Sequence, residues 1–227
     1  MPRTPLTALA LALMGLFATV ASAADLRGTQ APETTTEAGF FFVHLGPAGL
    51  ILDEGAEMYA GGARIPGGDI SVKSHLTFAA EVGYYFTPNV ALSFTGGFPP
   101  SVKIEAAGSL DGLGRVGGAT YGPVALTAHY HFTGLGRLQP YIGIGPAFMY
   151  VFDTNDGLMS RLKFDHAIGV AFQAGVDYMI SDHWGVFFDV KKIILRSEAT
   201  GNIGPAPIRA DVKLDPLVLH TGVTYRF

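Results

Sequence analysis

Eleven polar or ionisable side chains lie in segments that otherwise alternate between large apolar and small residues, and all of them fall on the small-residue side. They are His44, Glu81, Thr95, His129, His131, Gln173, Asp177, Asp189, Lys191, His220 and Arg226. A charge inside a protein is costly unless it is paired and hydrogen-bonded. The sequence therefore predicts a charge-paired plug inside the fold. The alternative is a gate whose members move when a ligand binds.

Two other kinds of chemistry have less support in the sequence. His129 and His131 share one face of their segment and, with His220, could ligate a metal, because imidazole is a common ligand. A lipid-modifying enzyme would need a nucleophile and a base within hydrogen-bond reach. Ser74 and His75 are adjacent in the chain, so they would point to opposite faces of a strand. We predict that the chain is not an enzyme and that it holds no metal and no cofactor.

The segments that carry these side chains have the period of two that is typical of β-strands. In "SHLTFAAEVGYYF", residues 74–86, every second residue from Leu76 to Phe86 is apolar, and the residues between them include Thr77, Glu81 and Gly83. The same pattern recurs in "VALSFTGGF" (90–98), "VALTAHYHF" (124–132) and "IGVAFQAGVDYMI" (168–180). We therefore predict four clear strands.

Four further segments complete the count. They are residues 39–46, 139–152, 184–194 and the C-terminal run "LHTGVTYRF". In the second of these we expect Ile142, Ile144, Phe148 and Tyr150 on the apolar face, opposite small residues. Eight strands close an antiparallel sheet with both chain ends on one side.

Composition indicates what surrounds this sheet. Of the 227 residues, 48% are hydrophobic and only 15% are charged, against about a quarter charged in a typical soluble domain, so the chain is unusually apolar. Backbone polar groups in lipid must be paired inside a closed structure, so strands can cross a membrane only as a barrel. A soluble, lipocalin-like barrel would place its apolar face inside. The opposite face here is mostly Gly, Ala, Ser and Thr, which is too small and too sparsely charged for a solvated surface.

The charge of the chain excludes one class of partner. The formal net charge is −4, and no basic run occurs anywhere in the sequence. A nucleic-acid-binding protein normally shows a basic patch or stripe. We therefore predict no nucleic-acid partner.

Residues 1–23 are typical of a cleaved secretory signal peptide. Arg3 precedes the apolar run "LTALALALMGLFATV", and Ala21-Ser22-Ala23 has the small residues of a cleavage site. The apolar run is shorter than the ~20 residues that a membrane-spanning helix needs. We expect residues 24–227 to form a β-barrel in the outer membrane of a Gram-negative bacterium, surrounded by outer-membrane lipid.

The connections between the expected strands alternate in length. Those at 87–89, 133–138 and 181–183 are short, whereas those at 53–73, 99–119, 153–162 and 195–209 are longer. Outer-membrane barrels have short periplasmic turns and longer extracellular loops, so the alternation also predicts the orientation. Aromatic side chains near the short turns would form an interfacial girdle. They are Tyr84, Phe86, Tyr130, Phe132, Tyr178, Trp184, Tyr225 and Phe227.

Four segments together resemble the OmpW family of small outer-membrane barrels, which includes the alkane-uptake porins. They are "FTPNV", "RLQPYIGIGPAF", "FQAGVDYMISDHWGVFFDVKKI" and the closing "VKLDPLVLHTGVTYRF"; the long loops match poorly. The resemblance implies a narrow, largely hydrophobic interior that takes up small hydrophobic molecules passively and releases them sideways into the membrane. It places the family's constriction at Thr95 and Lys191, although both are polar here. The final Phe227, with Tyr225, resembles the signal read by the barrel-assembly machinery.

Apolar residues at the outer ends of the strands are candidates for a hydrophobic entrance. They are Leu50, Leu52, Phe98, Pro99 and Ile193. Exposed apolar clusters often mark ligand-binding sites, but these residues would also fit a simple continuation of the lipid-facing band. The alternative function is a structural or surface-receptor barrel, used in adhesion, that does not transport.

Overall fold

The computed structural model describes residues 39–227, and the predicted signal peptide lies outside this range. The described residues form fourteen β-strands joined in one sheet. Within this range no helix is long and apolar enough to span a membrane. The chain is therefore all-β over the part that the structure describes.

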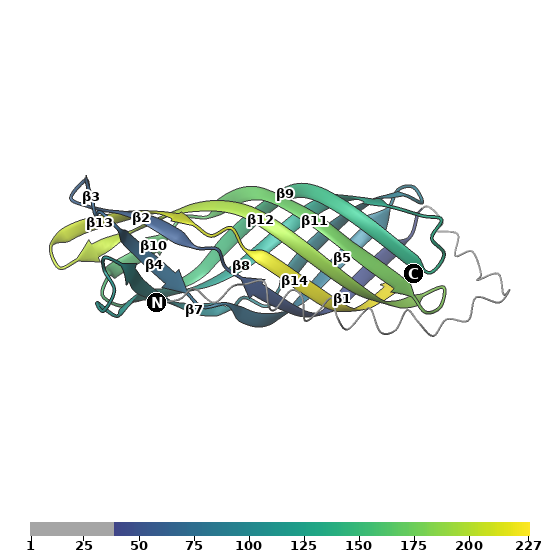
Figure 1. Cartoon of the computed structure of the whole chain (residues 1–227), viewed down its shortest axis with the longest axis horizontal. Helices are drawn as coiled ribbons and strands as arrows, with labels where there is room; N and C mark the ends of the chain where they lie inside the picture. The colour runs from purple at the N-terminus through teal and green to yellow at the C-terminus, as the bar shows by residue number, and fades with distance from the viewer. Residues whose placement is uncertain (1–38) are drawn as a thin grey trace. The chain divides into compact units, whose positions relative to one another are not determined.

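Eight of the strands close into an antiparallel barrel (Figure 1). In order around the barrel they are β1 (Phe41–Ile51), β5 (His75–Tyr85), β6 (Val90–Gly97), β8 (Arg115–His131), β9 (Leu138–Asp156), β11 (Ala167–Met179), β12 (Trp184–Ile203) and β14 (Leu217–Arg226). The last strand pairs with the first in a register that sets Phe42 opposite Arg226, and Phe227 N donates to Phe41 O at 3.0 Å. The predicted eight-stranded barrel is confirmed.

The four long connections, which were expected to be loops, contain most of six further strands of the same sheet. These are β2 (Gly55–Ala60), β3 (Ala63–Arg64), β4 (Gly68–Val72), β7 (Ser101–Gly108), β10 (Ser160–Phe164) and β13 (Ala206–Lys213). They pair with one another and with the outer ends of β8 and β12, at the end of the barrel opposite the C-terminus (Figure 1). We call this part the extension.

The extension exists because three barrel strands run far past the membrane. β8, β9 and β12 have 17, 19 and 20 residues, whereas a strand needs only about 9–11 residues to cross a bilayer. Their outer parts therefore stand in water and recruit further strands by backbone pairing.

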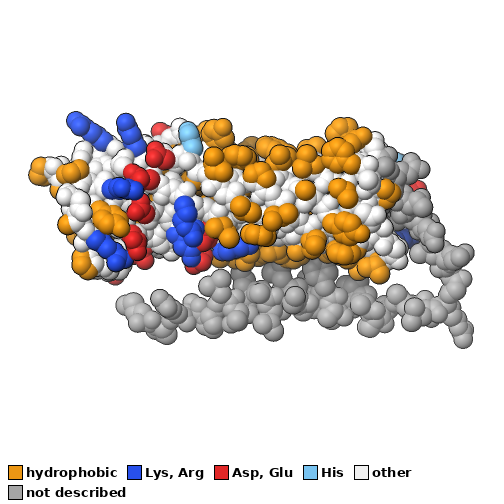
Figure 2. Space-filling view, turned by 90° about the horizontal axis from the view of Figure 1, so that it is seen from above, with side chains coloured by type: hydrophobic (Ala, Val, Ile, Leu, Met, Phe, Trp, Pro, Cys, Tyr) orange, Lys and Arg blue, Asp and Glu red, His pale blue; other side chains and the backbone are white. Residues whose placement is uncertain are grey.

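The lipid-facing side of the barrel carries the apolar residues that the alternation predicts. Phe41, Leu45 and Val186 are exposed, and so are Ile142, Ile144 and Tyr150 of the least regular strand. Figure 2 shows hydrophobic side chains covering the barrel, with charged side chains gathered on the extension. The predicted facing of the strands is confirmed.

An aromatic girdle lies at the short turns. The ring of Trp184 packs edge-on against Tyr225 at 4.6 Å between centroids, and Tyr225 packs against Phe227 at 4.9 Å. Rings of this kind sit at the level of the lipid headgroups. The girdle fixes the level of the barrel at its periplasmic interface.

The interior changes in character along the strands. Nearest the short turns, Phe42, Tyr85 and Ala91 form a small apolar cluster. Polar residues follow, and above them is an apolar section that includes Ala48, Leu50 and Ile193. A separate apolar core, with Met58 among its members, fills the extension.

Candidate functional site

The polar section of the interior is centred on a lysine held between two carboxylates. Lys191 Nζ donates to Glu81 Oε2 and to Asp189 Oδ1, each at 2.7 Å. Asp189 and Lys191 are two residues apart on β12, so they share its inner face, whereas Glu81 comes from β5. Thr95 Oγ1 also donates to Glu81 Oε2, at 3.0 Å. All three charged side chains are buried.

Gln173 links this group to the neighbouring wall. Its Nε2 donates to Asp189 Oδ2 at 2.7 Å, and its Oε1 lies 2.9 Å from His129 Nε2 and accepts from Thr127 Oγ1 at 2.8 Å. Tyr141 Oη donates to Asp189 Oδ2 at 2.9 Å. The polar groups thus form one connected network across the barrel.

A second buried group lies nearer the periplasmic end. Arg226 Nη2 donates to Asp177 Oδ2 at 3.0 Å, and His44 Nε2 lies 3.1 Å from Asp177 Oδ1. The His44 ring stacks on Phe187 with 4.2 Å between centroids. His131 contacts the Tyr85 hydroxyl at 2.9 Å. We call the two groups together the polar layer.

The structure therefore places every predicted interior residue on the inner face and joins most of them. Among the described residues, His220 and His131 have no charged partner, because His220 Nε2 contacts the backbone carbonyl of Ala79 at 3.2 Å and His131 contacts the Tyr85 hydroxyl. His129 and His131 have ring centroids 5.7 Å apart, but residues 39–227 contain no group of three or more His, Asp or Glu arranged to hold a metal. Whether these residues line a channel or form a gate stays a prediction.

The predicted hydrophobic entrance does not form one cluster. Leu50 and Ile193 are buried inside the barrel above the polar layer, and Leu52 lies farther out along the interior. Phe98 and Pro99 are exposed on the outer surface, where Phe98 is 72% accessible. The five residues thus lie in different places, and whether any of them forms an entrance stays a prediction.

Two small cavities mark the apolar section. The outer chamber, of about 30 Å³, is lined by Leu52, Val102, Phe164 and other residues where the barrel meets the extension. The wall cavity, of about 40 Å³, lies deeper and is lined by Leu50, Thr95 and Lys191 on the inside. Its lining also includes Gly96–Phe98 and Pro123, which belong to the barrel wall.

The wall is interrupted beside this cavity. Pairing between β6 and β8 stops at Thr95 opposite Ala125, and β7 resumes it only at Ser101 opposite Thr120. Between these points Tyr121 N donates to Pro100 O at 3.2 Å. We call this interruption the wall gap.

The wall gap was not predicted from the sequence, although its residues are of types that interrupt strand pairing. Residues 96–100 read "GGFPP" and residues 121–124 read "YGPV". Proline cannot donate to a strand ladder, and glycine weakens a strand. Two such clusters on neighbouring strands would have indicated a break in pairing.

Comparison with known sequences decides the family. The sequence model of the OmpW family matches residues 37–227. The chain belongs to the OmpW family. It is an outer-membrane β-barrel protein, and no enzymatic activity is indicated for it.

Relatives of this OmpW-family chain include an outer-membrane protein and a protein named for a dibenzothiophene metabolism operon. It is 32% identical to "Outer membrane protein AlkL" of Ectopseudomonas oleovorans, over 77% of this chain and 76% of the relative. It is 30% identical to "Dibenzothiophene metabolism operon protein PahQ" of Pseudomonas aeruginosa, over 87% of this chain and 93% of the relative.

Two solved structures share the fold of this OmpW-family barrel. The crystal structure of OprG from Pseudomonas aeruginosa aligns with a TM-score of 0.80 at 24% identity, covering 86% of this chain and 98% of that one. The solid-state NMR structure of AlkL in lipid bilayers aligns with a TM-score of 0.67 at 29% identity, covering 89% and 95%.

Proposed function

We propose that this barrel takes up small hydrophobic molecules passively and releases them sideways into the outer membrane. The molecules enter through the apolar core of the extension, reach the outer chamber and leave through the wall gap. The observation that carries the proposal is the position of the wall cavity, which touches both the apolar interior and the interrupted wall. The similarity to AlkL and to a protein named for a dibenzothiophene metabolism operon supports it.

The polar layer favours a sideways exit over passage to the periplasm. A hydrophobic molecule moving down the barrel axis would have to separate Lys191 from Glu81 and Asp189, which are buried and joined by short hydrogen bonds. Separating a buried ion pair costs several kcal/mol, because each charge is left without a partner. An eight-stranded barrel also has little room beyond its own side chains.

The wall gap can open at modest cost because few backbone donors lose partners there. Pro99, Pro100 and Pro123 have no N–H group, so they leave no unpaired donor in lipid, where each unpaired polar group is expensive. Gly96 and Gly97 add no side chain that would block the space.

A disulfide across the gap tests the exit. A Cβ placed on Gly96 would lie 3.6 Å from Val124 Cγ1, so Gly96→Cys with Val124→Cys brings two sulfurs within bonding reach. The chain has no cysteine of its own. We expect the oxidised double variant to lose most of the uptake of an n-alkane by intact cells, and a reductant to restore it.

The matched control joins the same two strands where they are already paired. Leu92 lies opposite Ala128 in the β6–β8 ladder, and both face lipid. Leu92→Cys with Ala128→Cys should leave uptake unchanged in either redox state. Equal uptake by the oxidised and reduced Gly96–Val124 variant would contradict release through the gap.

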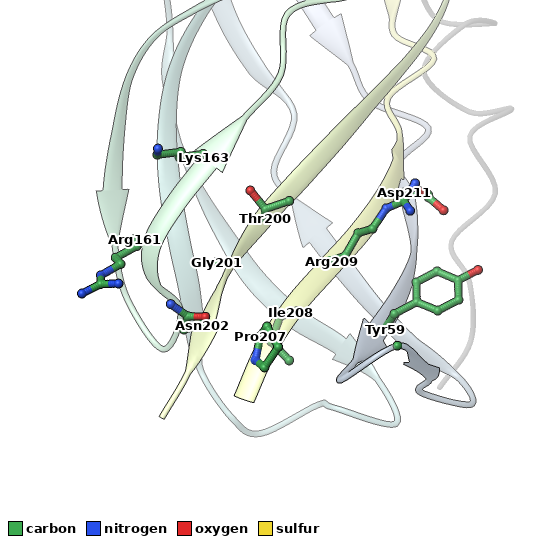
Figure 3. Close-up of a pocket in the computed structure, with 11 residues that line it drawn as sticks. Tyr59, Arg161, Lys163, Thr200, Gly201, Asn202, Pro207, Ile208, Arg209 and Asp211 are labelled. Carbon is green, nitrogen blue, oxygen red and sulfur yellow. The ribbon is translucent and has the colours of Figure 1, made fainter. Parts of the chain in front are cut away.

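A second function, surface interaction, is favoured by a groove on the extension. Lys163, Thr200, Arg209 and Tyr59 are successive partners across four strands, and with Arg161 they line a groove of about 770 Å³ (Figure 3). Arg209 is paired with Glu198 and Asp211. Over residues 39–227 no carboxylate lies within 4 Å of the charged ends of Arg161 and Lys163, which leaves both cations available to an anionic partner.

Reversing the charges of the two groove cations should separate surface interaction from uptake. Arg161→Glu with Lys163→Glu should abolish binding of whole cells to a surface coated with an acidic polysaccharide, while alkane uptake stays as in the wild type. The control is Arg64→Glu, because Arg64 already pairs with Glu57 outside the groove. Binding that survives the double reversal would remove the second function.

A further inference from the structure

The outer chamber contains one polar group in an otherwise apolar lining. Twelve side chains line the chamber. Eleven of them are apolar, among them Leu52, Val102 and Phe164, and the twelfth is Tyr121. Tyr121 is only 8% exposed. Its hydroxyl is buried and has no hydrogen-bond partner among residues 39–227.

A second unpartnered polar atom belongs to the ring beside it. His75 comes from β5 and packs edge-on against Tyr121 of β8, with ring centroids 6.2 Å apart and planes at 84°. His75 Nδ1 lies 3.4 Å from the Lys73 carbonyl, whereas Nε2 is buried without a partner in the described chain. Tyr121 in the chamber lining and His75 against its ring therefore each carry a buried polar atom that the described chain does not satisfy.

Buried polar groups are normally hydrogen-bonded, and exceptions call for an explanation. The Tyr121 hydroxyl stabilises nothing else in the fold, because phenylalanine would fill the same space without it. A passing molecule that carries an oxygen would accept a hydrogen bond from this hydroxyl. A plain hydrocarbon would leave it unpaired.

We propose that Tyr121, assisted by His75, selects hydrophobic molecules that carry a neutral oxygen function, such as a long-chain ketone, alcohol or phenol. This inference rests on the proposed uptake function and names its substrate class. The phenol donates to a carbonyl or hydroxyl oxygen. Because Nδ1 faces the Lys73 carbonyl as a donor, His75 Nε2 is an acceptor, so it receives a hydrogen bond from an alcohol and not from a ketone.

The charges near this pair favour a neutral ligand over a carboxylate. The charged group that acts on the Tyr121 hydroxyl is the carboxylate of Glu54, which would repel a second anion. Lys191, deeper along the path, is already held by Glu81 and Asp189. Among residues 39–227, the side chains that line the chamber include no cation that could neutralise an acid.

The test compares two molecules of equal chain length, dodecane and 2-dodecanone, in cells that carry the full-length protein. Tyr121→Phe removes only the hydroxyl. We expect ketone uptake to fall about fivefold, the ratio that one neutral hydrogen bond is worth, while dodecane uptake stays the same. Tyr130→Phe, on the lipid-facing side of the same strand, is the control and should change neither rate.

A binding measurement decides the inference independently of transport. Purified protein in detergent is mixed with 2-dodecanone labelled with ¹³C at the carbonyl, and the infrared carbonyl stretch is recorded. A hydrogen-bonded ketone gives a band at lower wavenumber, which we expect with the wild type and not with Tyr121→Phe. His75→Leu should keep this band and should slow the uptake of 1-dodecanol only.

The possible outcomes distinguish a failure of the Tyr121 inference from a failure of the proposed uptake function. If Tyr121→Phe slows both compounds equally, or slows neither, the inference is overturned and the uptake function stands. If the wild type speeds up neither compound relative to cells without the protein, the uptake function fails, and the infrared band still decides whether Tyr121 binds a ketone. A heat-dependent shift in gel mobility confirms that each variant is folded.

Discussion

The two halves of the barrel interior are built on the same strands but have opposite properties. In the periplasmic half, inward positions of β5, β12 and β1 hold Glu81, Lys191 and His44, which belong to the polar layer. A few residues farther out, the same strands place Ala79, Ile193 and Leu50 inward. The first half is held by specific bonds, and the second is held by apolar contact.

This difference suggests a division of roles in a barrel that is too narrow for an open pore. One half can close the barrel, and the other half can admit hydrophobic molecules. The bonded half resists entry of an apolar molecule because charges would have to separate. The apolar half contains cavities beside an interrupted wall, so a hydrophobic molecule displaces few hydrogen bonds there. In the proposed uptake, the first half acts as a seal and the second half acts as the passage.

The largest effect on stability is expected when the lysine at the centre of the polar layer is removed. Lys191→Met leaves Glu81 and Asp189 buried without their cation. We expect the free energy of unfolding to fall by about 3–5 kcal/mol, measured by urea titration of protein in lipid vesicles. Lys163→Met, on the exposed face of the extension, is the matched control and should have no measurable effect.

Removing the two carboxylate charges as well should recover part of the lost free energy of unfolding. The triple change Lys191→Met, Glu81→Gln and Asp189→Asn removes the unpaired charges together. If this variant is no more stable than Lys191→Met alone, charge pairing is not what holds the seal.

A smaller stability effect with a large effect on transport is expected in the passage. Ala125 lines the wall cavity, so Ala125→Leu fills part of the existing space and should cost about 1–3 kcal/mol. Alkane uptake should nevertheless fall several-fold, because the added side chain occupies the way to the wall gap. Ala128→Leu on the lipid-facing side of β8 should leave uptake unchanged. Normal uptake by Ala125→Leu would place the passage elsewhere.

The smallest effect on stability is expected at Asp215, which lies where the barrel meets the extension. Burial of Asp215 opposes its ionisation, but Arg196 and the Leu195 N–H hold the pKa of this carboxyl below its usual range. A lowered pKa stabilises the fold above the ordinary carboxyl pKa of about 4. This contribution is lost as the pH falls through the lowered pKa.

Asp215→Asn should therefore cost about 1 kcal/mol or less at neutral pH, because the Arg196 side chain is largely exposed. Asparagine tolerates the left-handed backbone at this position, where φ is 23°. The deficit relative to the wild type should disappear in urea titrations at low pH. A deficit that is the same at every pH would show that the charge of Asp215 is not its cause.

The strands that cross lipid could be predicted from the sequence because lipid demands one pattern. Phe41, Ile144 and Val186 are apolar because they face hydrocarbon, and their neighbours are small because the interior is narrow. The inward position of each polar residue follows from the same period of two. Their pairing does not follow, since Glu81 and Lys191 are 110 residues apart and lie on strands that are not neighbours.

The strands of the extension were missed because the pattern is reversed there. In β13, Ile208, Ala210 and Val212 point inward, whereas Arg209 and Asp211 point outward. This is the pattern of a soluble barrel, which the sequence analysis considered only for the whole chain. Tyr121 was missed for a related reason, because it precedes the segment recognised as a strand.

The prolines at the wall gap also bear on what the barrel does not bind. An unpaired strand edge is a template on which another chain can add a strand, and this hazard is normally blocked by charge, bulges or proline. Pro99, Pro100 and Pro123 offer no N–H group to an incoming strand. The edge that this wall exposes can therefore be open to small molecules in the membrane and still be a poor template for another polypeptide.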